Sequence, residues 1–131
     1  MTFYGLDLTL SYSGFRPIPD SHGVRISIQQ QLDNRQSFLE ISQTETVFDL
    51  PSASFKQVTT IPYRFDSSQL LRFQVLRVAD ESETLTGREG EVDVALASLA
   101  CSPVPVSLTL PSGVCITAQL RVPPTYNDYI R

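Results

Sequence analysis

The sequence predicts a single all-β domain that folds as an eight-stranded antiparallel β-sandwich. Apolar and polar residues alternate in segments such as 6–12, 24–29 and 114–122, and this period of two is typical of half-buried strands. Nine prolines and six glycines are scattered along the chain as turn-forming residues. No stretch of a dozen residues has a convincing helical pattern, so the sequence favours a sandwich or a barrel of short strands.

We expect the eight strands at residues 6–12, 24–29, 37–45, 55–63, 71–75, 92–96, 104–108 and 114–122. Residues 14–23 and the polar, acidic residues 79–90 are expected to be loops. Pro103 and Pro105 indicate that the seventh strand lies at a sheet edge, because proline cannot donate a ladder hydrogen bond. Residues 1–122 are expected to form the domain, and residues 123–131 a C-terminal tail or a linker.

Composition and charge exclude several functional classes. The net charge is −4 and the ten basic residues form no cluster, which argues against a nucleic-acid partner and against general binding to anionic membranes. No apolar stretch approaches the roughly 20 residues that a membrane-spanning helix needs, and the chain starts without a secretion signal. We therefore expect a cytoplasmic protein in which Cys101 and Cys115 are free thiols.

The sequence does not predict an enzyme, and no cofactor is expected. A hydrolase triad needs a histidine base between a carboxylate and a nucleophile, and the only histidine, His22, lies in a proline-rich loop. Two cysteines and one histidine do not supply the four ligands of a structural zinc site. The segment 87–90 contains two glycines but lacks the lysine of a phosphate-binding loop.

One segment resembles a known family. It runs Tyr-Arg-Phe-Asp-Ser-Ser-Gln-Leu-Leu-Arg-Phe-Gln-Val from Tyr63 to Val75, and Thr44-Glu45 precedes it ahead of a break in the strand pattern. This segment is similar to the middle of a C2 domain, most closely to the C2 domains of copines, and the resemblance extends from Leu6 to Val122. It implies an eight-stranded antiparallel sandwich with the functional loops gathered at one end.

The resemblance is incomplete where family members bind calcium through aspartates from two loops. Here the first loop has one carboxylate, Asp20, and Arg77 and Ala79 stand at the positions of the aspartate pair in the second loop. A guanidinium cannot act as a cation ligand. The comparison therefore implies a calcium-independent domain, with a degenerate calcium site formed by Asp20, Asp80 and Glu81 as the alternative.

The leading hypothesis is a non-catalytic, calcium-independent C2-like module that binds a protein partner. It would be the N-terminal part of a larger scaffold or cytoskeletal protein, or a small adaptor. Residues 80–93 contain six acidic side chains against the single Arg88, which is typical of a solvated face and could also receive a basic partner.

The alternative is a peripheral membrane or phospholipid binder, which would place the protein at a membrane rather than at the cytoskeleton. In this hypothesis Phe15 and Ile18 insert into the bilayer beside Arg16, and Asp20 completes the set of candidate binding residues. A second interpretation is that Phe15 and Ile18 only cap one end of the core. Because the lysine-rich strand patch of lipid-binding relatives is missing, we expect any phospholipid binding to be weak.

Overall fold

The computed structural model describes residues 3–19, 21–32, 37–64, 68–79 and 84–121. The predicted tail at 123–131 lies outside this part of the chain. In chain order the elements are β1 (Phe3–Ser13), β2 (Gly23–Leu32), β3 (Leu39–Gln43), β4 (Val47–Phe48), β5 (Ala53–Ser54), β6 (Thr59–Arg64), β7 (Gln69–Val78), β8 (Leu85–Ala95), α1 (Leu96–Ala100), β9 (Val106–Thr109) and β10 (Cys115–Arg121).

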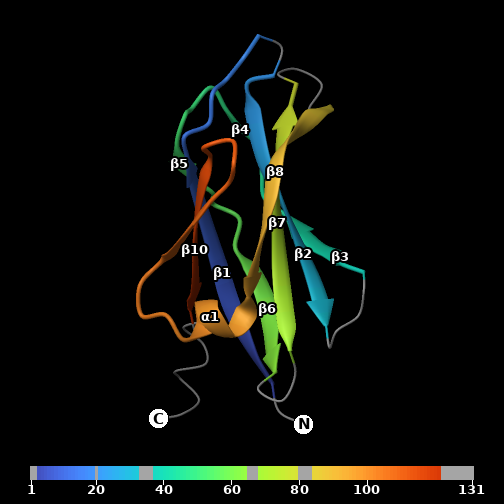
Figure 1. The fold of residues 1–131 in the computed structure, drawn as a ribbon, viewed down its shortest axis with the longest axis vertical. Helices are drawn as coiled ribbons and strands as arrows, with labels where there is room; N and C mark the ends of the chain where they lie inside the picture. The colour runs from blue at the N-terminus through green and yellow to red at the C-terminus, as the bar shows by residue number, and fades with distance from the viewer. Residues whose placement is uncertain (1–2, 20, 33–36, 65–67, 80–83, 122–131) are drawn as a thin grey trace.

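The strands form two antiparallel sheets packed face to face (Figure 1). In the first sheet β1 and β10 are central, β9 is one edge, and β5 and β6 follow one another along the far side of β1. In the second sheet β2 and β7 are central, β8 is one edge, and β3 and β4 share the far side of β2. The ten described strands therefore fill eight strand positions, which confirms the all-β antiparallel sandwich predicted from the sequence.

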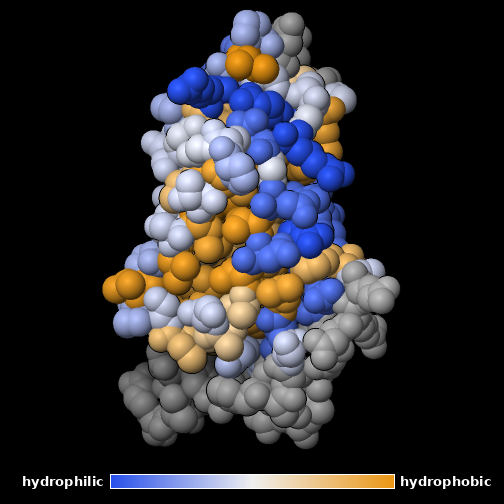
Figure 2. Space-filling view, viewed as in Figure 1, coloured by the Kyte–Doolittle hydropathy of each residue, from blue (hydrophilic) through white to orange (hydrophobic). Residues whose placement is uncertain are grey.

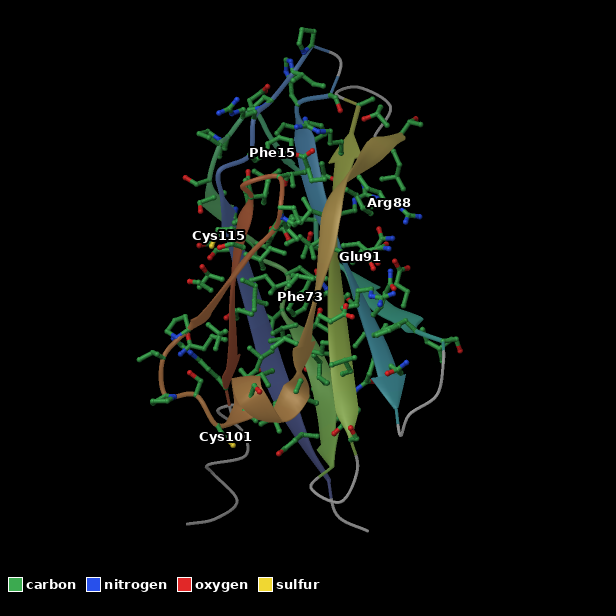
Figure 3. All side chains as sticks on the ribbon, in the orientation of Figure 1. Phe15, Phe73, Arg88, Glu91, Cys101 and Cys115 are labelled. Carbon is green, nitrogen blue, oxygen red and sulfur yellow. The ribbon has the colours of Figure 1, made fainter. Side chains whose placement is uncertain are left out.

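The core lies between the inner faces of the central strands. In β7, Phe73 and Val75 are fully buried, and they pair with the buried Ile28 and Ile26 of β2. Phe73 lies at the centre of the sandwich (Figure 3). The five-residue helix α1 closes one end of the core with Leu96, and no helix in the described residues is long and apolar enough to span a membrane.

Some predicted boundaries are wrong, although the edge assignment holds. Strand β8 begins at Leu85, so residues 85–90 of the predicted acidic loop belong to a strand. Strand β6 begins at Thr59 and contains Pro62 in its interior, which it tolerates because β1 is its only partner in the described part of the chain. The structure confirms β9 as an edge strand, since β10 is its only partner among the described strands. It also confirms that Cys101 and Cys115 are free thiols.

Thr44 and Glu45, which belong to the C2-like pattern, both fasten the connection between β3 and β4, Thr44 within the second sheet and Glu45 to the first sheet. The Thr44 hydroxyl accepts a hydrogen bond from the backbone N–H of Ile26 at 2.9 Å. The Glu45 carboxylate accepts bonds from the backbone N–H groups of Lys56 at 2.5 Å and Gln57 at 3.1 Å. Burial raises the pKa of Glu45, but these hydrogen bonds outweigh it and the pKa is lowered. Glu45 thus fastens the β5–β6 segment of the first sheet to the β3–β4 connection of the second.

We expect Glu45→Ala to lower the free energy of unfolding at pH 7 by about 1–3 kcal/mol, because two N–H groups lose a charged acceptor. The folded-state pKa of Glu45 is lowered, so this contribution is present above the unfolded pKa of about 4.3 and is lost as pH falls through the folded pKa. Urea unfolding at pH 7 and at pH 3 measures the difference between wild type and variant, which should shrink at pH 3.

Lys56→Ala is the matched control, because it keeps the backbone N–H and removes an exposed side chain whose charge is the smallest cause of the lowered Glu45 pKa. It should change the free energy of unfolding by less than about 0.5 kcal/mol. An equal loss at both pH values in Glu45→Ala would contradict an ionised carboxylate as the acceptor.

Candidate functional site

The candidate site is the end of the sandwich opposite α1, called here the loop end. The connections 14–22 and 49–52 meet there, and β7 ends and β8 begins at the same end (Figure 1). Of the four predicted binding residues, Arg16 and Ile18 are exposed, whereas Phe15 is buried with 1% exposure. Asp20 lies outside the described residues. Two of the four candidates are therefore placed where a partner can contact them.

Phe15 is buried in the structure instead of being exposed as a contact residue. Gly14 has a left-handed φ of 77°, and a Cβ atom at this position would lie 2.7 Å from the carbonyl oxygen of Gly113. After this turn the N–H of Phe15 donates to the carbonyl of Pro51 at 3.1 Å, and its ring meets Tyr12 edge-on at 6.1 Å. Phe15 belongs to the hydrophobic core and caps it, as the second interpretation of this loop proposed, whereas Ile18 is exposed.

The loop end instead exposes apolar side chains from three different segments. Ile18, Leu50 and Leu85 are 47%, 48% and 49% exposed. The hydroxyl of Tyr12 donates to the carbonyl of Leu50 at 2.8 Å and so holds the second of these segments against β1. Burial raises the pKa of Tyr12, which keeps this hydroxyl protonated as a donor. The sequence analysis missed Leu50 and Leu85, because isolated apolar residues in polar segments give no periodic signal.

The single histidine forms a local pair with an aspartate. His22 Nδ1 lies 2.7 Å from Asp49 Oδ1, and the N–H of Asp49 donates to the carbonyl of His22 at 3.1 Å. Asp49 has a left-handed φ of 65°, a conformation that aspartate tolerates better than most residues. The backbone bond and the tight turn indicate that this pair shapes the chain after β4, and nothing about it requires catalysis.

Arg77 carries the most unusual electrostatic arrangement at the loop end. It pairs with the buried Val24, so its side chain points toward the inner face of the sheet. The guanidinium lies 4.6 Å from the centre of the Phe15 ring. It donates to both carboxylate oxygens of Glu89 at 3.1 and 3.0 Å, and to the carbonyl of Ser21 at 3.3 Å. The Arg77 and Glu89 side chains are only 13% and 18% exposed, so this ion pair closes the mouth between the sheets.

A β-bulge in β8 makes this ion pair geometrically feasible. The register changes from Val75–Gly90 to Leu76–Arg88, which leaves Glu89 as the extra residue on β8. Gly90 has a φ of 142°, a conformation that favours glycine. A bulge re-aims the side chain beside it, and here it directs the carboxylate toward the guanidinium. Sequence reasoning missed Glu89 because it treated this segment as a loop, although a glycine between alternating residues is a bulge signal.

The remaining described acidic residues of the segment 80–93 are also paired with an arginine of β7. Arg72 Nε lies 2.8 Å from Asp93 and 3.2 Å from Glu91. The hydrogen bond to Asp93 raises the pKa of Arg72. The described part of this segment is thus a strand with paired charges rather than an acidic loop. Three further acidic residues of the segment lie outside the described residues, namely Asp80, Glu81 and Glu83.

No group of three or more His, Cys, Asp and Glu side chains in the described residues could hold a metal ion. The carboxylates of the alternative calcium site, Asp20, Asp80 and Glu81, fall outside these residues, so that site stays a prediction. What the described residues do show is the Arg77–Glu89 ion pair, fixed at the mouth of the loop end.

Comparison with known proteins adds no family to this description. No protein-family model matches the chain, and no curated protein sequence matches it. Fold and site together define an antiparallel β-sandwich domain whose loop end is closed by a largely buried arginine–glutamate pair.

We expect the Arg77–Glu89 pair to contribute more to stability than the more exposed Arg72–Asp93 pair. Arg77→Met leaves Glu89 largely buried without its partner and should cost about 2–4 kcal/mol. A double-mutant cycle with Glu89→Gln should give a coupling energy above about 1 kcal/mol by urea unfolding. The matched cycle, Arg72→Met with Asp93→Asn, should give less than about 1 kcal/mol because solvent screens it. Equal coupling energies in the two cycles would contradict an enclosed pair.

Proposed function

We propose that the chain is a calcium-independent, C2-like interaction module that binds a protein partner and catalyses nothing. The observation that carries the proposal is Arg77, which the resemblance aligns with the first aspartate in the second calcium loop of the family. An arginine there cannot ligate a cation and repels one. Arg77 is held there by its ion pair with Glu89 and its contact with the Phe15 ring, so its guanidinium fills the space that a metal would need.

The fold supports the C2-like part of the proposal. The strands fill eight positions of an antiparallel sandwich, and the connections with candidate contact residues meet at one end. Residues that carry the resemblance have structural roles in this sandwich, which is compatible with a C2-like fold that has no calcium ligands. Gln69 is 6% exposed and its side-chain amide donates to the carbonyl of Pro62 at 2.7 Å, which fastens β7 to β6.

The charge of the chain supports a protein as the partner. At a net charge of −4, an anionic bilayer repels the domain on average, whereas a protein contact needs no basic surface. Free sheet edges and the exposed apolar residues of the loop end are surfaces of the kind that protein partners use. We place the module in the cytoplasm, as the N-terminal part of a larger scaffold or cytoskeletal protein.

We expect calcium at millimolar concentration to leave the thermal unfolding midpoint unchanged. A ligand that binds only the folded state stabilises it by about 2.7 kcal/mol at a hundredfold excess over its dissociation constant, which raises the midpoint by several degrees in a domain of this size. Differential scanning calorimetry with calcium and with EDTA measures the effect. An upward shift that EDTA reverses would overturn the proposal and indicate a site formed by Asp20, Asp80 and Glu81.

A membrane-binding function is the second candidate, and the exposed Ile18, Leu50 and Leu85 are the observation that favours it. Full burial of one such side chain in a bilayer yields about 1.5–3 kcal/mol. Without a basic cluster, three partly inserting residues barely offset the cost of association. The membrane hypothesis therefore predicts weak binding that does not respond to calcium.

Vesicle co-sedimentation tests this candidate with phosphoinositide-containing vesicles. We expect little pelleting of the wild type, and no difference between calcium and EDTA. The triple variant Ile18→Ser, Leu50→Ser and Leu85→Ser should pellet to the same small extent as the control Val58→Ser. Val58 is 46% exposed, and it lies just before β6, away from the loop end. Strong pelleting that is lost in the triple variant and kept in the control would establish the membrane function instead.

A further inference from the structure

The four edges of the two sheets differ in how well they are protected against pairing with another chain. Strand β6 contains Pro62, and β9 has only four residues and follows Pro103 and Pro105. Strand β3 has five residues and meets β2 through an irregular register. Proline, short length and bulges are the usual devices that block edge pairing. Strand β8 has eleven residues and no proline, and its register with β7 is regular over residues 90–95.

The unprotected stretch of β8 borders an apolar gap between the sheets. Val92 and Val94 pair with buried residues of β7 and therefore face inward, as do Val106 and Leu108 of β9. All four are only partly buried, because no described strand covers the side of the sandwich where β8 and β9 form the edges. Figure 2 shows the resulting apolar band across the middle of the face that β8 and β10 share in Figure 1.

The ends of this gap are closed, which limits the occupant to one short segment. Toward the loop end, Leu110 packs against Gly90, where an added Cβ atom would lie 3.8 Å from its methyl groups. Toward the other end, β8 runs directly into α1, whose Leu96 and Leu99 are buried. Between them β8 offers six residues, a strand edge of roughly 20 Å. An extended peptide fits such an edge because it can form hydrogen bonds with the unpaired backbone groups of β8. A helix could not form these bonds.

The charges on the outer face of residues 90–95 favour some extended peptides over others. Glu91 and Asp93 both form ion pairs with Arg72, Glu91 also accepts a hydrogen bond from the Gln74 amide at 3.0 Å, and the two side chains remain 41% and 38% exposed. Arg88 lies just outside residues 90–95, so within this stretch two carboxylates against one guanidinium leave a net negative charge beside the free edge (Figure 3 shows Glu91 on the side of β8 away from β10). Antiparallel pairing of two copies through residues 90–95 would bring these carboxylates opposite their counterparts, which is destabilising. A segment with basic residues on this face is stabilised instead.

We propose that β8 binds an extended peptide segment by strand addition, and that the recognised segment alternates apolar residues with lysine or arginine. Its backbone pairs with residues 90–95, its apolar side chains enter the gap beside Val106 and Leu108, and its basic side chains meet Glu91 and Asp93. This inference rests on the proposed function as a protein-binding module and names the partner's chemistry.

A labelled, end-blocked peptide with the sequence Lys-Val-Lys-Val-Lys-Val-Lys is the probe, and fluorescence anisotropy measures its binding to the full chain. We expect saturable binding, and at least about tenfold slower amide hydrogen exchange within residues 90–95 when the peptide is bound. Two control peptides should bind at least about tenfold more weakly: Lys-Lys-Lys-Lys-Val-Val-Val, which keeps the charge without the alternation, and Glu-Val-Glu-Val-Glu-Val-Glu, which reverses the charge.

The protein variants test the same contact from the other side. Glu91→Lys combined with Asp93→Lys should weaken binding at least about tenfold. Glu40→Lys is the matched control, because Glu40 lies on the outer face of the same sheet at its opposite edge, and it should change binding less than about twofold. Circular dichroism checks that each variant is folded, and the charge-reversed peptide gives the same information on the wild-type chain if the double variant unfolds.

The inference is overturned by absence of saturable binding, by protection at the loop end or at β9 instead of β8, or by equal binding of the block-ordered peptide. Any of these results combined with an unchanged unfolding midpoint in calcium leaves the proposed function standing without its strand-addition site. A calcium-dependent midpoint shift overturns the proposed function itself, whatever the peptide does.

Discussion

The alternation of inward-facing and outward-facing side chains along β7 is the constraint on which the rest of the structure depends. Because side chains alternate along a strand, a register that buries Phe73 and Val75 against β2 also turns Arg77 inward at the end of the strand. A charge directed between two sheets needs a partner, and Glu89 supplies it only because a bulge at Gly90 changes the register of β8. The core, the ion pair and the shape of the loop end are thus consequences of one alternating pattern.

Sequence reasoning captured the parts of this fold that depend on local alternation, as in β1, β2 and β10. It failed where the backbone leaves that alternation. Phe15 is buried because the left-handed Gly14 turns the chain inward, and no side-chain period encodes such a turn. The first half of β8 is exposed and polar, so its strand conformation comes from pairing with β7 rather than from its own composition. The Arg77–Glu89 ion pair could not be predicted from the sequence for the same reason. It forms only because residues 85–90 are a strand and because this strand has a bulge at Glu89.

Two of the residues that carry the family resemblance connect different parts of the β-sandwich through hydrogen bonds. Glu45 binds two backbone N–H groups across the sheets, and Gln69 fastens β7 to β6. Such positions report how the chain is folded and say little about what it binds. This explains why the sequence could predict an antiparallel sandwich and its loop end, while the partner must be inferred from surfaces: three exposed apolar residues at one end and a charged, unprotected edge on β8.

The pairing of the first and last described strands has a consequence for how the domain acquires its fold. Asp7 lies opposite Arg121, so the centre of the first sheet joins segments more than a hundred residues apart. Closing so long a loop carries a large entropic cost before any contact compensates it, and chains dominated by distant pairings fold slowly. During synthesis β1 can pair with β6, and β2 can pair with β7 and β8, before β10 has been made. The first sheet is completed only when β10 joins β1, so we expect the second sheet to be complete first and to act as the template.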